Sequence, residues 1–259
     1  MSGLQRLELR GMAALAGREV RRVFALWTQT ILPPFVTALL FLAVFGGALG
    51  SRIRELEGLD YAGFIVPGLL VMTVVGQSFG NSSTSLFQAK NEGYIEDLLT
   101  SPLAPWQLAL GYLAGGFVRG LVAATAVAAV ALPIAWEGGG NVGLAVLALV
   151  ICALVFAALG VITGVWSESF DQHSFVASIV ITPLALLGGV FYSADALGEP
   201  WATLTRIDPL YYLVDATRGG LTGFHESPIW ISLLVAAGIA AAAFAAATAL
   251  IRSGWRLKA

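Results

Sequence analysis

Side chains that usually carry out chemistry in proteins are scarce in this chain. Its 259 residues include one cysteine, Cys152, and two histidines, His173 and His225. A lone cysteine has no intramolecular disulfide partner, and the histidines lack ligand-like spacing, so we interpret each histidine as a loop residue. A phosphate-binding loop, G-x-x-x-x-G-K-[ST], places glycine directly before lysine, and neither Lys90 nor Lys258 follows a glycine. These residues predict no metal centre, no nucleophile and no nucleotide site in the chain itself.

One charged stretch, KNEGYIEDLLTSPLAPWQ at residues 90–107, separates two long apolar runs. A helix over residues 91–100 would place Glu92 and Glu96 together on one side. Its other side would carry Tyr94, Ile95, Leu98 and Leu99. The two prolines that follow would end this helix, and either suits the first turn of the next helix. An acidic face beside an anionic membrane surface is unfavourable, so the segment is either a docking site for a soluble partner protein or a solvated loop helix.

The elements that hold this stretch are apolar enough to lie in a membrane. The composition is 58% hydrophobic and 12% charged, against about 25% charged residues in soluble domains. Apolar runs reach the roughly 20 residues that a helix needs to span a bilayer, and they do not alternate as barrel strands do. We predict an all-α integral membrane protein with six transmembrane helices. The expected spans are about 31–50, 61–83, 106–134, 142–166, 174–192 and 229–251.

Basic residues predict the orientation of these spans. Six spans place both termini on one side, and Lys and Arg are enriched in cytoplasmic segments. With cytoplasmic termini, the inner residues are Arg6, Arg10, Arg18, Arg21, Arg22, Lys90, Arg252, Arg256 and Lys258. The outer residues are Arg52, Arg54, Arg206 and Arg218. The excess on the inner side predicts cytoplasmic N- and C-termini.

Residues 1–30 have the pattern of an amphipathic helix at the cytoplasmic interface. Apolar residues such as Leu15 and Val23 alternate there with arginines in a helical period. The alternative is a simple extension of the first span. Pro33 and Pro34 favour a break between the two, because proline disfavours helical geometry in the residue before it.

Polar side chains within the spans suggest two competing roles. Thr73, Gln77, Asn81 and Thr84 follow one face of the second span. They either line a translocation path or form interhelical hydrogen bonds, worth about 0.6 kcal/mol each. Phe175, Ser178, Thr182 and Gly189 form a stripe on the fifth span that would be the opposing wall. In the third span, Gly111, Gly115, Gly116 and Gly120 predict close helix packing. Arg119 is expected to snorkel or to pair with a carboxylate, and the less favoured alternative is a role in binding an anionic substrate.

Residues 193–228 are too broken by glycine and proline to cross the membrane, yet too apolar for a free loop. We expect short helices that re-enter from the outer face, where protein or water covers the irregular backbone. Asp208, Asp215 and Arg218 are candidates for a local ion network. Asp215 and Arg218 stand three residues apart, a spacing that suits an ion pair on a helix.

Four segments resemble a known family. YAGFIVPGLLVM, NEGYIEDLLTSPLAPWQLALGYLAGGFVRGL and IDPLYYLVDATRGGLTG, preceded by REVRRVF, are similar in order and separation to the motifs of ABC-2-type transporter permeases. The resemblance covers nearly the whole chain. It implies one transmembrane domain over residues 1–259, with an interfacial helix in 1–30, a cytoplasmic coupling segment in 84–105 and an extracytoplasmic re-entrant segment in 193–228.

The resemblance also implies partners and residue roles. Such subunits work as homodimers in the bacterial inner membrane, surrounded by lipid, with a dimer of cytoplasmic ATPase subunits that binds ATP and Mg²⁺. No cofactor in this chain and no nucleic acid is expected. The ATPase-coupling residues would be Asn91, Glu92, Gly93, Tyr94, Ile95, Glu96, Leu98 and Leu99. The substrate path would be lined by Thr73, Gln77, Asn81, Phe175, Ser178 and Thr182. An outer gate would contain Phe191, Pro209, Tyr211, Tyr212, Asp215 and Arg218.

The expected function is that of a permease subunit, not an enzyme, in an exporter driven by a separate ATPase. The path is thinly polar and has few aromatic residues, whereas sugar polymers are commonly held by stacked aromatic rings. A lipidic or amphiphilic, drug-like substrate is therefore favoured. The alternatives are a polysaccharide or lipid-linked glycan exporter of the same family and, with less support, a membrane-embedded enzyme acting on lipid.

Overall fold

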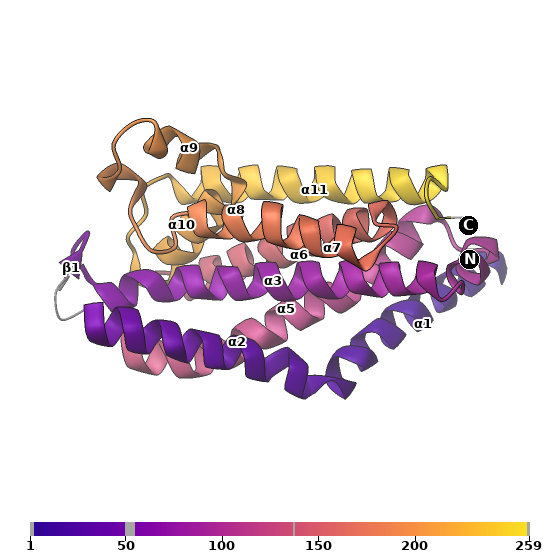
Figure 1. Cartoon of the computed structure of the whole chain (residues 1–259), viewed down its shortest axis with the longest axis horizontal. Coiled ribbons are helices and arrows are strands. Elements are labelled where there is room, and N and C mark those ends of the chain that lie inside the picture. The colour runs from indigo at the N-terminus through magenta and orange to yellow at the C-terminus, as the bar shows by residue number, and fades with distance from the viewer. Residues whose placement is uncertain (1–2, 50–54, 137, 258–259) are drawn as a thin grey trace.

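The computed structural model describes residues 3–49, 55–136 and 138–257. Long helices lie side by side, and both termini are found at the same end of the bundle (Figure 1). We call this the terminal end; the opposite end carries the hairpin of β1 (Glu55–Leu56) and β2 (Leu59–Asp60). Of the basic residues counted for orientation, Arg52, Arg54 and Lys258 lie outside the described residues.

Among the described residues, six helical segments are long and apolar enough to cross a membrane, which confirms the six predicted spans. They are Trp27–Gly47, Tyr61–Asn91, Pro105–Ala135, Val142–Trp166, Phe170–Leu187 and Ile229–Ser253. The first combines α2 (Trp27–Phe41) with the π-helical turns η1 (Leu42–Leu49), and the next three are α3 (Tyr61–Asn91), α5 (Pro105–Ala135) and α6 (Val142–Trp166). The fifth combines α7 (Phe170–Val176), η2 (Ala177–Ile181) and α8 (Thr182–Leu187), and the sixth is α11 (Ile229–Ser253).

Helix α3 forms the centre of the bundle. Within its apolar stretch 72% of residues are buried, against 17%, 11% and 22% for the first, fifth and sixth spans. The glycines of α5 permit this packing, as predicted. A Cβ atom at Gly116 or Gly120 would collide with Ser78 or Ser82 of α3, and one at Gly111 would collide with Leu15. The buried centre and exposed outer spans leave three apolar surfaces for lipid or another chain.

Helix α1 (Gly3–Ala25) is separate from α2, because the chain turns at Leu26 and the two helices diverge (Figure 1). The prediction that Pro33 and Pro34 break the helix is wrong, since both lie inside α2. Pro33 lacks the N–H that would reach the carbonyl of Gln29. Arg119 of α5 donates to that carbonyl instead, at 3.3 Å, so the freed acceptor is satisfied by another helix. The membrane-interface position of α1 stays a prediction.

The charged stretch forms a shorter helix than expected, α4 (Ile95–Thr100). Helix α3 continues to Asn91, and Gly93 then adopts a left-handed conformation with φ of 80°. Glycine takes this conformation without a steric penalty, so it ends the preceding helix. Glu92 therefore follows α3 and does not share a helical face with Glu96, which corrects the predicted helix over 91–100.

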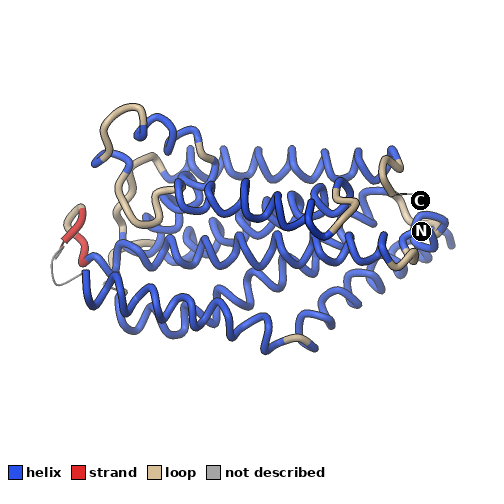
Figure 2. The backbone as a smooth tube through the Cα atoms, viewed as in Figure 1, coloured by secondary structure: helices blue, strands red, loops and turns tan. Residues whose placement is uncertain are grey.

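Short helices connect the fifth and sixth spans at the opposite end, where many of the loops also gather (Figure 2). They are η3 (Ala194–Ala196), α9 (Trp201–Ile207) and α10 (Pro209–Thr222), and α10 packs on α3, α6 and α11. Short helices were predicted here, and their depth in a membrane stays a prediction. His225 lies in the loop after α10, as expected, but His173 lies buried in α7, so its assignment to a loop is wrong.

Candidate functional site: the coupling segment, a polar path and the opposite end

The coupling segment is attached to the bundle through its apolar side chains. Ile95 is only 4% exposed, and Tyr94, Leu98 and Leu99 are partly buried beside it. They pack into a hydrophobic cluster to which α1, α3, α5, α6 and α11 all contribute, with Leu86, Tyr112 and Ile251 among its members. A displacement of α4 would therefore act on a cluster to which five helices contribute.

The acidic side chains of the same segment point away from this cluster. Glu92, Glu96 and Asp97 are exposed, as are Asn91 and Gly93. Across the described residues, the ion pairs involve other carboxylates, those of Glu19, Glu168 and Asp195. Tyr94 also contacts α1, because the Arg18 guanidinium lies 5.2 Å from the centre of its ring. The segment thus combines a buried apolar side with an accessible acidic side.

A second charged surface at the terminal end includes Lys90 of α3. It was not predicted from the sequence. The Lys90 ammonium donates to the carbonyls of Val165 and Ser167, at 2.6 and 2.8 Å, and so satisfies the end of α6. Beside it, Arg256 pairs with Glu168 at 3.2 Å. These side chains line a pocket of about 400 Å³. The available signal was Lys90 itself, the basic residue at the start of the charged stretch.

The polar face of α3 is used mainly for contacts between helices. Gln77 accepts a hydrogen bond from Arg119 Nε at 2.9 Å, and Asn81 Oδ1 accepts from Arg22 and Arg119 at 3.2 and 3.5 Å. The Thr73 hydroxyl donates to its own helix, at the Leu69 carbonyl. Arg119 therefore contacts amide groups and a backbone carbonyl, and among the described residues it does not form the carboxylate pair that was one of the predicted alternatives. Gln77 and Asn81 fit the alternative of interhelical hydrogen bonding, while a path along the same face stays a prediction.

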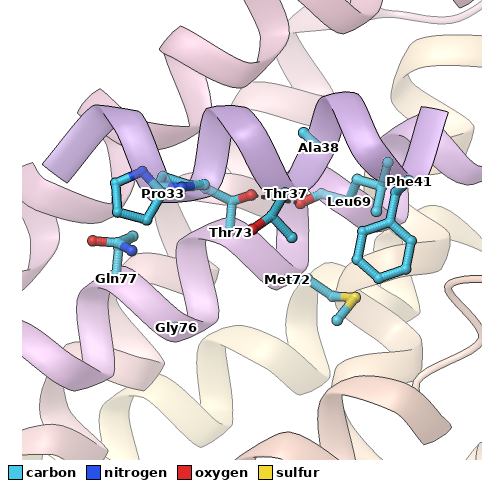
Figure 3. A pocket seen from close by; sticks show the side chains of 10 residues that line it. Pro33, Thr37, Ala38, Phe41, Leu69, Met72, Thr73, Gly76 and Gln77 are labelled. Carbon is cyan, nitrogen blue, oxygen red and sulfur yellow. Dashed lines mark hydrogen bonds between the residues drawn. The ribbon is translucent and has the colours of Figure 1, made fainter. Parts of the chain in front are cut away.

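Part of this face also borders a pocket of about 220 Å³ between α2 and α3. Gln77 lies beside Pro33 near one end, Thr73 beside Thr37 in the middle and Phe41 at the other end (Figure 3). The pocket is mostly apolar, with Leu69 and Met72 completing its wall. It is the cavity that the predicted path residues Thr73 and Gln77 share.

Residues expected to form the opposing wall lie elsewhere in the subunit. Phe175, Ser178 and Thr182 are exposed or partly exposed on the fifth span, and they are not among the residues around the α2–α3 pocket. The Thr182 hydroxyl donates to the Ala177 carbonyl across the π-helical turn η2. A path between these residues and Thr73 stays a prediction for an assembly larger than one chain.

Aromatic side chains of the predicted outer gate take part in aromatic contacts at the opposite end. Phe191 stacks on Phe41 and Phe45 of the first span, with ring centroids 5.3 and 5.1 Å apart. Tyr211 contacts Tyr212 edge to face, and its hydroxyl donates to Glu226 at 3.1 Å. Gating by these residues stays a prediction.

Charged residues of that region do not form the predicted ion network. Arg218 is only 1% exposed and donates to the carbonyls of Phe64 and Gly189, at 3.2 and 2.6 Å. Its guanidinium also lies 3.8 Å from the centre of the Phe64 ring. Asp215 instead accepts the backbone N–H groups of Glu226 and Ser227, at 2.7 and 2.9 Å. Neither side chain is in an ion pair among the described residues, because irregular backbone supplies closer partners.

Helix α10 begins at another buried carboxyl group. Asp208 caps this helix by accepting the N–H of Leu210 at 2.9 Å, while Pro209 occupies the first helical position. Burial raises the pKa of Asp208 to about 6, and it also raises the pKa of Asp215. The cap corrects the expectation that Asp208 belongs to an ion network.

Two buried polar contacts had no counterpart in the sequence predictions. Glu19 of α1 is 1% exposed and accepts a hydrogen bond from Ser85 at 2.6 Å, beside Arg18 and Arg22. His173 Nε2 lies 2.7 Å from the Ser83 hydroxyl oxygen. Both contacts join residues that are more than 60 positions apart, so local sequence patterns carry no signal for them.

Comparison with known proteins places this architecture in a family. The model of the ABC-2 type transporter family matches residues 10–222. The inner membrane transport permease YadH of Escherichia coli K12 is 35% identical over 218 residues, which cover 84% of this chain and 85% of YadH. Nodulation protein J of Rhizobium meliloti is 23% identical over 237 residues, which cover 90% of each chain. The predicted resemblance is confirmed, and the chain belongs to the ABC-2 type transporter family.

Proposed function

We propose that this chain is the permease subunit of an ATP-driven exporter in a bacterial inner membrane. It moves a lipidic or amphiphilic substrate out of the cytoplasm, and a separate ATPase subunit binds ATP and Mg²⁺ and hydrolyses the nucleotide. Membership of the ABC-2 family supports this role, as do the six spans and the name of YadH as an inner membrane transport permease. The terminal end then faces the cytoplasm.

The two-sided coupling segment is the observation that carries the proposal. Exposed carboxylates at Glu92, Glu96 and Asp97 offer a docking surface to a partner with basic or polar groups. On the other side, Ile95 is buried where five helices meet. Movement of a docked ATPase would pass through α4 to these helices, because close-packed side chains transmit displacement.

A homodimer is proposed from the exposed apolar spans. The first and fifth spans bury only 17% and 11% of their apolar stretches within one chain. Phe175, Ser178 and Thr182 belong to this surface of the fifth span. A second copy would cover part of it and would create a path between two subunits, in keeping with the closed symmetry of most homo-oligomers.

The pocket between α2 and α3 favours an amphiphilic substrate over a glycan. Phe41 is the single aromatic residue in its wall, which is otherwise aliphatic or small and polar. For a membrane-embedded enzyme, the Ser83–His173 contact is a starting point among the described residues. The Ser83 hydroxyl lies 2.7 Å from the carbonyl of Phe79 in its own helix, and no acidic group orients His173 in the described hydrogen bonds. Transport is the better supported function.

Charge reversal in the coupling segment tests the proposal. Glu96→Arg and Glu92→Arg should each reduce co-purification of the ATPase with the tagged permease at least tenfold, through like-charge contact at the docking surface. Both side chains are exposed, so the free energy of unfolding of the permease should change by no more than about 0.5 kcal/mol. Glu55→Arg, an exposed reversal at the opposite end, is the matched control and should leave ATPase recovery unchanged. Wild-type recovery in both coupling variants would show that the segment is only a solvated loop.

A further inference from the structure

Two arginine side chains converge where α1, α3 and α5 meet. Arg22 of α1 and Arg119 of α5 both donate to one oxygen, Asn81 Oδ1, at 3.2 and 3.5 Å. Each guanidinium is fixed further by α3, since Arg22 also donates to Gln88 and Arg119 to Gln77. Two positive charges, one from α1 and one from α5, are therefore held side by side against α3.

The negative charge around this pair does not balance it. Glu19 is the carboxylate in contact, 3.3 Å from Arg22, and it is shared with Arg18 at 2.9 Å. In the described part of the chain Arg119 pairs with no carboxylate, and its hydrogen bonds go to two amides and the Gln29 carbonyl. Three arginines and one glutamate leave a net charge of +2, which an anion joining the cluster would lower.

An apolar groove begins at the same place. Gln77, which accepts from Arg119, also lines the pocket of about 220 Å³ between α2 and α3. From Gln77 the groove runs toward Phe41, with Leu69 and Met72 in its wall (Figure 3). Residues 69 to 77 of α3 span about 12 Å at 1.5 Å per residue, enough for a substantial part of an acyl chain.

We infer that this junction binds an amphiphile through an anionic phosphate head group. Arg22 and Arg119 hold the phosphate, and the groove between α2 and α3 holds the apolar chain. The planar guanidinium presents paired N–H donors that match phosphate oxygens, and the head group supplies the missing negative charge. The inference deepens the proposed function, on which its meaning for transport rests, by giving the substrate class as an anionic, phosphate-bearing lipid-like molecule.

Lipid binding to the full-length permease in detergent tests this site. Native mass spectrometry should show dioleoyl phosphatidic acid binding at least tenfold more tightly than dioleoyl phosphatidylcholine, with one tight site per chain. Arg119→Gln and Arg22→Gln should each remove most of this preference, and Arg119→Lys, which keeps the charge but loses the paired N–H donors, should keep only part of it. Arg252→Gln, at an exposed arginine of the terminal end, is the matched control and should bind as the wild type does.

A groove variant keeps the test decisive if an arginine variant does not fold. Gly76 lines the pocket, and no neighbouring side chain or facing backbone lies within 4 Å of the point where a Cβ atom would stand. Gly76→Leu therefore fills the groove and leaves both arginines in place. It should weaken phosphatidic acid binding at least fivefold. Two results would mean that the site recognises a free phosphate: wild-type affinity in Gly76→Leu, or displacement of the lipid by 10 mM glycerol phosphate. Either would overturn the inference that the ligand is an amphiphile.

Three further results would overturn the inference. They are equal affinity for the two lipids, wild-type preference in both Arg→Gln variants, and an equal loss in Arg252→Gln, which would indicate diffuse attraction of anionic lipid. Binding is measured without an ATPase, whereas the proposed function is tested by ATPase recovery with the coupling variants. Failure of one is therefore distinguishable from failure of the other.

Discussion

The two ends of the molecule use charged residues in opposite ways. At the terminal end, α4 buries its apolar side, and the carboxylates of Glu92, Glu96 and Asp97 remain exposed. At the opposite end, Asp215 and Arg218 are at most 1% exposed and are bonded to backbone groups of other segments. Exposed charge is available to a partner, whereas buried charge here stabilises irregular backbone. Acidic residues at the two ends, such as Glu96 and Asp215, therefore have different roles.

Irregular backbone explains why the opposite end needs buried charge. The chain between the fifth and sixth spans leaves peptide groups at Gly189, Glu226 and Ser227 outside regular helices. Buried N–H and C=O groups must find partners, and Arg218 and Asp215 provide them. At the terminal end, basic side chains complete the end of α6, where Lys90 and Arg256 donate to its last carbonyls. Its acidic side chains are left free for other contacts.

The largest effect should come from removing a buried charge at the opposite end. Asp215→Ala leaves the partly buried N–H groups of Glu226 and Ser227 without their acceptor, and a buried group without a partner costs about 1–3 kcal/mol. We expect a loss of about 3 kcal/mol in stability, measured by thermal unfolding in detergent with tryptophan fluorescence. Asp195→Ala removes an exposed carboxylate of the same region and should cost no more than about 0.5 kcal/mol. Similar melting of both variants would contradict the assigned role of buried charge.

A smaller effect should separate the two sides of α4. Ile95→Ala removes buried methyl groups from the five-helix cluster and should cost about 2 kcal/mol. Its neighbour Glu96 is exposed, so Glu96→Ala should change stability by about 0.5 kcal/mol or less. The same thermal assay measures both variants. If Glu96→Ala proved the more destabilising, the acidic side of α4 would be a structural surface.

The six spans could be predicted because their signal is local. Length and continuous apolarity are properties of each segment alone, and they located all six helices. The predicted helix break near Pro33 and Pro34 was wrong because the signal there is not local. Its outcome depends on Arg119, 90 residues from the carbonyl that it satisfies. The start of α4 depends on Gly93, which adopts a left-handed conformation and ends α3. Residue spacing alone could not distinguish this break from a continuous helix.

Contacts in the candidate site could be predicted less well than the helices. The polar face of α3 was found from its period, but the arginines that bond to Gln77 and Asn81 come from α1 and α5. Asp215 and Arg218 have the spacing of an ion pair, yet each prefers backbone partners brought in by other segments. Helical period identifies which residues share a face, and tertiary packing decides what that face meets.

The smallest expected effect is a pH dependence at the start of α10. Burial raises the pKa of Asp208 from 3.8 to about 6, and its side chain caps the helix through the N–H of Leu210. A carboxyl group with a raised pKa in the folded state contributes stability below pH 3.8, and this contribution is lost as the pH rises through about 6. Asp208→Asn keeps a capping oxygen and cannot ionise.

The wild type should therefore lose stability relative to Asp208→Asn between about pH 4 and pH 7, by about 1 kcal/mol or more. That corresponds to roughly 2–4 °C in a chain of this size. Thermal unfolding at a series of pH values measures the difference. Asp208→Ala is the control, because it loses the cap as well as the charge and should melt below Asp208→Asn by a similar margin at every pH. A constant difference between wild type and Asp208→Asn across this pH range would show that burial does not hold this carboxyl group in its protonated form, and that the opposite end tolerates a negative charge there.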